Sequence, residues 1–170
     1  MALWQPAYVG LGSNLGDPVA QVRQALRGLA GLPQTRLVAV SRLYGSRPLG
    51  PVVQPDFVNA VAGLLTGLSA LALLRQLRAL EIAAGRPAVH EHWGPRVIDL
   101  DVLVFGTEQC TSTELVLPHP GVVERNFVLY PLADIAPDLE VPGSGRVREL
   151  LDRVSAAGVW PLGEARPGEG

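Results

Sequence analysis

Lysine is absent from this 170-residue sequence, so all 14 of its cationic side chains are arginines. A phosphate-binding loop of the Walker type needs a lysine at a fixed position, and that type of nucleotide site is therefore excluded. Cys110 stands alone, which excludes an intrachain disulfide and any zinc site with two or more cysteines. This cysteine usage is typical of a reducing compartment, and residues 1–12 lack the features of a signal peptide. We expect a cytoplasmic protein.

Strong charge of one sign is also lacking, because the net charge is −2 at pH 7 and charged residues make up 18% of the chain. This balance argues against a basic nucleic-acid surface. Residues 57–74 carry no charge and approach the length of a membrane helix. They contain Asn59, Thr66 and a turn signal, so we interpret them as a buried strand followed by the start of a helix. We expect neither a nucleic acid nor a membrane as partner, and a monomeric protein.

Apolar spacing and turn residues predict an alternating order of strands and helices. Strands are expected over residues 7–12, 37–44, 57–65 and 98–105. Helices are expected to begin at Asp17–Pro18 and at Ser69, and to end near Gly31 and Gly85. The resulting βαββαβ order over residues 7–105 is the ferredoxin-like arrangement. It predicts an α+β fold with an antiparallel sheet and helices on one face.

Additional C-terminal elements are expected after this unit. They comprise a short strand at 115–117, a helical turn at 128–135 and a short helix at 146–154. We expect a single domain over residues 1–170 with a core at about 7–154, and a flexible tail over 161–170.

Two aspartates, Asp99 and Asp101, interrupt the apolar strand predicted at 98–105. Alternation along a strand places both on one face, with Leu100 on the other. Paired carboxylates suit Mg²⁺, which commonly binds through one or two carboxylates together with substrate phosphates. A solvated strand face, or neutralisation by an arginine such as Arg96, would explain the same pattern.

A second candidate is the loop from Gly85 to Arg96, which carries Arg86, Trp93 and Arg96. Flexible glycines and arginines suit a loop that closes over a phosphate chain. An ordinary surface loop with its Trp packed on the body would look similar.

Aromatic residues amount to only 5% of the chain, so Phe57 and Phe127 stand out beside polar neighbours. Core packing is one interpretation, and a flat heteroaromatic substrate held between them is the other. His119, between two prolines, would either donate to a phosphate or cap a loop.

Together these segments resemble the 6-hydroxymethyl-7,8-dihydropterin pyrophosphokinase family, enzymes of folate synthesis. The segments that carry the resemblance span about residues 7–142 in order. They are Gly12-Ser13-Asn14-Leu15-Gly16-Asp17, Gln54-Pro55-Asp56-Phe57-Val58-Asn59-Ala60, Glu81 with Gly85-Arg86, His92-Trp93-Gly94-Pro95-Arg96-Val97-Ile98-Asp99-Leu100-Asp101, Leu117-Pro118-His119-Pro120 and Arg125-Asn126-Phe127.

The resemblance implies transfer of pyrophosphate from ATP to the hydroxymethyl group of the pterin, with release of AMP. It implies that Asp99 and Asp101 hold two Mg²⁺ ions, and that Arg86 and Arg96 act with them in catalysis. The ATP contacts implied are Glu81, Arg86, Trp93, Arg96, Val102, His119 and Arg125. The pterin contacts implied are Ser46, Leu49, Phe57, Asn59 and Phe127.

The loop departs from the family pattern at Ala88, Val89 and His92, where relatives often carry cations. This predicts weaker use of ATP, offset in part by Arg78, whose position is often neutral in relatives. The alternative function is a ferredoxin-like module that binds a pterin or nucleotide without turnover, and a protein-interaction domain is the third. Incubation with ATP, Mg²⁺ and the hydroxymethyl pterin would distinguish them.

Overall fold

The computed structural model describes residues 3–85 and 97–163, and their centre is an antiparallel sheet of six strands. The sheet order is β10-β3-β4-β1-β5, and β2 also pairs with β4. The strands are β1 (Gln5–Ser13), β2 (Thr35–Val40), β3 (Tyr44–Ser46), β4 (Phe57–Thr66), β5 (Asp99–Phe105) and β10 (Val159–Pro161). Two small hairpins lie outside the sheet, made of β6 (Cys110–Thr111) with β7 (Val116–Leu117) and β8 (Glu140–Val141) with β9 (Gly145–Arg146).

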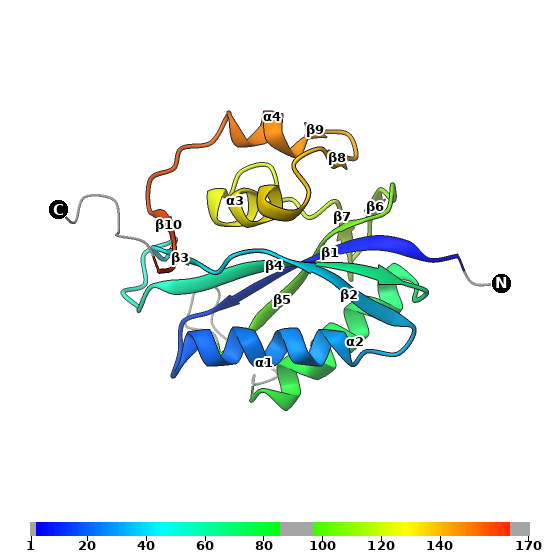
Figure 1. Cartoon of the computed structure of the whole chain (residues 1–170), viewed down its shortest axis with the longest axis horizontal. Helices are drawn as coiled ribbons and strands as arrows, with labels where there is room; N and C mark the ends of the chain where they lie inside the picture. Colours follow the sequence, from blue (N-terminus) through cyan, green and yellow to red (C-terminus); the bar gives the residue numbers. More distant parts are fainter. Residues whose placement is uncertain (1–2, 86–96, 164–170) are drawn as a thin grey trace.

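The four helices of the described residues lie on the two sides of the sheet, two on each side (Figure 1). The first pair is α1 (Pro18–Ala30) and α2 (Ala70–Ala83), and the second is α3 (Asn126–Ile135) and α4 (Val147–Leu151). The unit from β1 to β5 has the predicted order, with α1 and α2 on one face, and the α+β ferredoxin-like expectation is confirmed. The second pair of helices belongs to the expected C-terminal elements.

The starts of α1 and α2 are fixed by side-chain caps at the predicted residues. The Asp17 carboxylate accepts the N–H of Ala20, and Pro18 occupies the first turn. The Ser69 hydroxyl accepts the N–H of Ala72. Each cap satisfies a backbone donor that the first turn leaves unpaired.

Two apolar cores lie on the two faces of the sheet. The larger one joins β1, β4 and β5 to α1 and α2, with Leu29, Leu73 and Leu77 fully buried. The smaller one joins the sheet to α3 and α4 through residues such as Leu129 and Leu132. The sheet is therefore rigidly packed on both sides, which gives any site on it a fixed floor.

Three predicted elements differ from the structure. The strand expected over 37–44 is divided into β2 and β3, which both pair with β4, because at Ser41 the side-chain hydroxyl accepts the N–H of Val61 in place of a backbone carbonyl. The helical turn expected at 128–135 is the full helix α3. Residue 161, expected in a flexible tail, belongs to β10 and pairs with Tyr44.

None of the helices in the described ranges combines the length and the apolar character that crossing a bilayer requires. The uncharged stretch at 57–74 forms β4 and the start of α2, as expected from its polar residues.

Candidate active site

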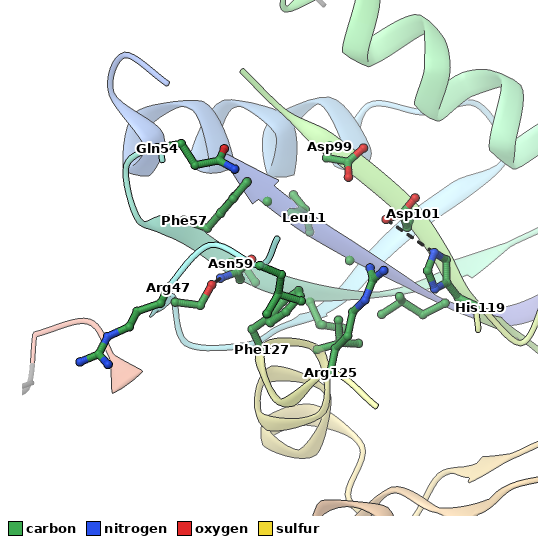
Figure 2. A pocket seen from close by; sticks show the side chains of 18 of the residues that line it. Leu11, Arg47, Gln54, Phe57, Asn59, Asp99, Asp101, His119, Arg125 and Phe127 are labelled. Carbon is green, nitrogen blue, oxygen red and sulfur yellow. Dashed lines mark hydrogen bonds and ion pairs between the residues drawn. The ribbon is translucent and has the colours of Figure 1, made fainter. Parts of the chain in front are cut away.

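A cavity of about 320 Å³ lies between the sheet and the N-terminal end of α3. This is at the lower end of the volumes typical of small-molecule sites. Its lining combines carboxylates, arginines, an imidazole and two phenyl rings (Figure 2). The lining residues are Gly10, Leu11, Gly12, Ser46, Arg47, Leu49, Gln54, Phe57, Asn59, Ala60, Val61, Arg78, Asp99, Asp101, Leu103, His119, Arg125, Phe127 and Val128.

Strand β5 places Asp99 and Asp101 side by side at one end of this cavity (Figure 2). Leu100 points the other way and is fully buried in the larger core. The alternation predicted from sequence is therefore present. The alternation is interrupted only between Leu103 and Val104, which both lie in the smaller core, where the register with β1 shifts between Tyr8 and Val9.

Glycines of β1 stand opposite the two aspartates, with Gly12 paired to Asp99 and Gly10 to Asp101. A Cβ at Gly12 would lie 3.4 Å from the Asn59 side chain, and one at Gly10 would lie 3.3 Å from Leu103. The two glycines thus keep the floor of the cavity free of side chains beside the carboxylates.

The surroundings of Asp101 disfavour its charged form. Burial, and then the charge of Asp99, raise the pKa of Asp101 to about 7. The nearest nitrogen donors among the described residues are set back, with Arg78 Nη2 3.9 Å from Asp101 Oδ1 and His119 Nε2 3.8 Å from Asp101 Oδ2. A divalent cation between the two carboxylates would remove the repulsion that raises this pKa.

The donor set fits Mg²⁺ better than a transition metal. Within the described residues there is no group of three or more histidine, cysteine or acidic side chains that could hold a metal ion. Two carboxylates alone leave most of an octahedral shell to water and to substrate oxygens, which is the usual arrangement for Mg²⁺. The chemistry of the pair therefore fits the ion that the sequence implied.

Helix α2 reaches the aspartate strand through Arg78 and Glu81. Arg78 Nη1 donates to Glu81 Oε1 at 2.7 Å and to the carbonyl oxygen of Leu100 at 2.9 Å. Glu81 Oε2 accepts the N–H of Leu100 at 2.9 Å. Since β5 ends the sheet order, this pair satisfies the backbone of Leu100 where a further strand would otherwise do so.

His119 presents its Nε2 to the aspartates, because its Nδ1 accepts the N–H of Gly121 at 2.9 Å. Burial, and the nearby Arg125, lower the pKa of His119. The neutral ring thus carries its proton on Nε2, where it can donate a hydrogen bond. Arg125 is the second cation of this wall and lies over the Phe127 ring, with its Cζ 5.9 Å from the centroid.

The other end of the cavity is aromatic. Phe57 extends from the start of β4 and Phe127 from the first turn of α3, with Asn59 between them (Figure 2). Phenyl faces at such positions suit a flat heteroaromatic ring. Asn59 adds a polar edge, since its Nδ2 donates to Ser46 Oγ at 2.6 Å and its position is fixed.

The structure brings nine of the predicted site residues to this cavity. They are Ser46, Leu49, Phe57, Asn59, Asp99, Asp101, His119, Arg125 and Phe127. Arg86, Trp93 and Arg96 lie outside the described residues. Glu81 and Val102 do not line the cavity, because both side chains are buried beneath the sheet, where Val102 packs in the larger core and Glu81 holds Leu100.

The lining also includes residues to which sequence reasoning gave no role, such as Arg47, Gln54 and Leu103. Gln54 lies within one of the motifs, and its Oε1 accepts from Asn14 Nδ2 at 2.8 Å, so this motif could have indicated it. Strand alternation could also have indicated Leu103, because it follows Asp99 and Asp101 at the same two-residue spacing. Arg47 follows β3 and extends away from the aspartates (Figure 2).

Comparison with known proteins supports one family. A family model described as 7,8-dihydro-6-hydroxymethylpterin-pyrophosphokinase (HPPK) matches residues 8–137. A 2-amino-4-hydroxy-6-hydroxymethyldihydropteridine pyrophosphokinase of Pseudomonas aeruginosa is 50% identical over 159 residues, covering 93% of this chain and 97% of the relative. The protein of the same description from Haemophilus influenzae is 46% identical over 145 residues, covering 85% and 90%.

Solved structures agree at the level of the fold. The wild-type HPPK-DHPS of Plasmodium falciparum with pterin and p-hydroxybenzoate has a TM-score of 0.69 at 14% identity. This match covers 90% of the present chain and 43% of the other chain, so the present chain spans less than half of that protein. Residues 8–137, which the family model matches, include the aspartate strand, both phenylalanines and His119. The chain therefore belongs to the 7,8-dihydro-6-hydroxymethylpterin-pyrophosphokinase family.

Proposed function

We propose that this protein transfers a diphosphate group from ATP to the hydroxymethyl oxygen of 6-hydroxymethyl-7,8-dihydropterin in folate biosynthesis. The hydroxymethyl oxygen forms a bond to the β-phosphorus, the bond from that phosphorus to the α,β-bridging oxygen breaks, and AMP leaves. One observation carries the proposal: the carboxylate pair shares one cavity with the space between Phe57 and Phe127, which we call the aromatic slot. A flat acceptor in the slot would thus direct its substituent toward phosphates held at the aspartates.

Asp99 and Asp101 would hold two Mg²⁺ ions together with the phosphates of ATP. Bound there, the ions would neutralise charge on the attacking and leaving oxygens. The raised pKa of Asp101, caused by burial and by the charge of Asp99, supports this assignment, because a cation bound there would stabilise the charged form.

The remaining polar groups would bind the phosphate chain. Arg78 and Arg125 supply fixed positive charge at the cavity wall, and His119 directs an Nε2 donor into it. Phosphoryl transfer depends mainly on positioning and charge neutralisation, so no covalent nucleophile is required. We propose three further ATP contacts from the sequence motif alone, namely Arg86, Trp93 and Arg96. The nucleoside is proposed to lie along β5 near Glu81 and Val102.

Phe57 and Phe127 would hold the pterin ring, and Asn59 would recognise its polar edge beside Ser46 and Leu49. The hydrogen bond from Asn59 to Ser46 supports this role, because it fixes the amide before the substrate arrives. We also propose that the protein acts as a monomer in the cytoplasm. The cysteine content supports the location.

The test is incubation with ATP, Mg²⁺ and 6-hydroxymethyl-7,8-dihydropterin, with AMP measured over time. AMP formation that requires both the pterin and Mg²⁺ would support the enzyme. Tight binding of the pterin with no AMP would favour the non-catalytic module instead.

A further inference from the structure

Residues 155–161, which we call the C-terminal strut, contact the two elements beside the aromatic slot, namely α3, which carries Phe127, and β3, which pairs Ser46 with Phe57. One contact is made to the first residue of α3. Asn126 Nδ2 donates to the carbonyl oxygens of Ser155 and Ala157, each at 2.8 Å. Asn126 stands between Arg125 and Phe127, both of which line the cavity.

The other end of the strut is joined to β3. The carbonyl oxygen of Gly158 accepts the N–H of Arg47 at 2.9 Å. Strand β10 then pairs with β3 so that Val159 is opposite Ser46. Ser46 in turn accepts the hydrogen bond from Asn59.

Close packing fixes this second junction. The ring of Trp160 is 5% exposed and lies against Gly45. A Cβ at Gly45 would be 2.4 Å from the ring, so only glycine admits the indole at this distance. β10 therefore cannot slide along β3 without losing a buried aromatic contact.

Helix α3 is thus held against the β3 side at both of its ends. At its C-terminal end, the Tyr44 hydroxyl donates to Asp134 Oδ1 at 2.8 Å, and Arg42 pairs with the same carboxylate. At its N-terminal end, Asn126 is joined to β3 through the strut. The N-terminal junction is the one beside Phe127.

We propose that the C-terminal strut sets the width of the slot for the pterin ring, and that Asn126 is the positioning residue that joins it to α3. The inference rests on the proposed placement of the pterin between Phe57 and Phe127. A preorganised slot loses less conformational entropy when a flat ligand binds. Without the Asn126 contacts, Phe127 would have to be ordered at the moment of binding.

Arg125 adjoins the strut contact at Asn126, but the other charged residues proposed to face the phosphates are positioned by other elements. Asp99 and Asp101 are held by β1, and Arg78 by Glu81 and the Leu100 carbonyl. Loosening the strut should therefore weaken pterin binding and leave ATP binding almost unaffected, whereas general destabilisation would weaken the binding of both substrates.

The experiment compares Asn126→Ala and Trp160→Leu, which release the strut at opposite ends, with the control Asp138→Asn. The control removes an exposed ion pair between Arg148 and Asp138 at 2.6 Å in the same C-terminal region. Thermal unfolding shows that each variant is folded, and assays are run well below the lowest midpoint. Steady-state kinetics gives KM for each substrate. Direct titration gives Kd for Mg·ATP. A second titration gives Kd for 6-hydroxymethyl-7,8-dihydropterin in the presence of Mg²⁺ and α,β-methylene-ATP, an analogue that cannot be cleaved between its α- and β-phosphates.

Both strut variants should raise KM and Kd for the pterin by about fivefold or more, since two neutral hydrogen bonds or one aromatic contact are lost. Their kcat and their Kd for Mg·ATP should stay within about twofold of the wild type, as should every constant of the control. Unchanged pterin constants in both variants, or equal loss for both ligands, would overturn the proposal.

Phe127→Ala separates this inference from the proposed function. If it weakens pterin binding while both strut variants do not, the strut alone is wrong. If it leaves pterin binding unchanged, the pterin lies elsewhere, and both the placement and the strut are overturned.

Discussion

Glu81 accepts the backbone N–H of Leu100 at 2.9 Å, and Leu100 is the residue between the two aspartates. The carboxylate is 1% exposed and also receives Arg78 at 2.7 Å. A side chain of α2 thereby fixes the edge strand from which Asp99 and Asp101 extend. Preorganised ligands of this kind bind a cation without first being ordered.

Glu81→Leu should destabilise the protein by about 1–3 kcal/mol, since the buried N–H of Leu100 loses its acceptor and Arg78 loses its closest partner. Glu81→Gln keeps an acceptor for Leu100, and its stability should fall between those of Glu81→Leu and the wild type. Urea unfolding at pH 7 measures both. A Glu81→Leu variant as stable as the wild type would show that the contact to Leu100 does not hold the strand.

Asp101 should make the metal-free protein less stable as the pH rises. Its pKa is raised from 3.8 to about 7 in the folded state, so between these values the folded protein binds more protons than the unfolded chain. Its contribution is therefore fully present below about pH 4 and is lost as the pH rises through 7. Asp101→Asn should remove this dependence of stability on pH and stabilise the metal-free protein at pH 8 by about 1–2 kcal/mol. The gain is no larger because the side chain is 29% exposed and solvent screens part of its charge.

Unfolding by urea in EDTA at several pH values between 4 and 8 measures this prediction, with Asp138→Asn as the matched control on an exposed pair. The same Asp101→Asn variant should lose turnover. Parallel pH profiles for the wild type and the Asp101→Asn variant would contradict the interpretation of the carboxylate pair.

Arg78→Gln should raise KM for Mg·ATP by about tenfold, the equivalent of one charge-assisted hydrogen bond, and leave pterin affinity unchanged. The reason is that Arg78 lines the cavity at its carboxylate end, away from the phenyl rings. Steady-state kinetics with each substrate varied in turn measures the effect. If KM for Mg·ATP did not change, Arg78 would serve only to hold Glu81 and Leu100.

Phe127→Ala should have the opposite pattern. It should weaken pterin binding by about tenfold, through lost stacking and lost apolar contact, with little effect on Mg·ATP. Leu129→Ala is an unsuitable control because Leu129 is fully buried in the smaller core. Val116→Ala, on an exposed hairpin strand, is suitable and should leave both constants unchanged. Equal affinities for Phe127→Ala and the wild type would place Phe127 in the core rather than in the slot.

Much of this site follows from local sequence patterns. Asp99 and Asp101 could be assigned to one face because strand alternation depends only on spacing, and the starts of α1 and α2 follow from the caps Asp17 and Ser69. The roles of Phe57 and Phe127 became specific only through the motifs around them. Each ring alone fits a core equally well.

Other features depend on contacts between distant segments. Glu81 lies one turn beyond Leu77 on the buried face of α2, so its burial follows from helical periodicity, but its partner Leu100 does not. β3 has only three residues and is defined by pairing with β4 and with β10. No local pattern shows that Trp160 packs on Gly45, and the sequence therefore predicted a flexible tail from residue 161.

The most direct test of the central claim follows each phosphate of ATP. Three samples of ATP, labelled at the α-, β- or γ-phosphorus, are incubated with the protein, Mg²⁺ and 6-hydroxymethyl-7,8-dihydropterin, and the products are separated. Diphosphate transfer at the aspartate pair predicts that the β and γ labels enter the pterin product in equal amounts while the α label is found in AMP. The Asp101→Asn variant should form none of these labelled products. Entry of the γ label alone, or no label in the pterin from a protein that binds both substrates, would contradict it.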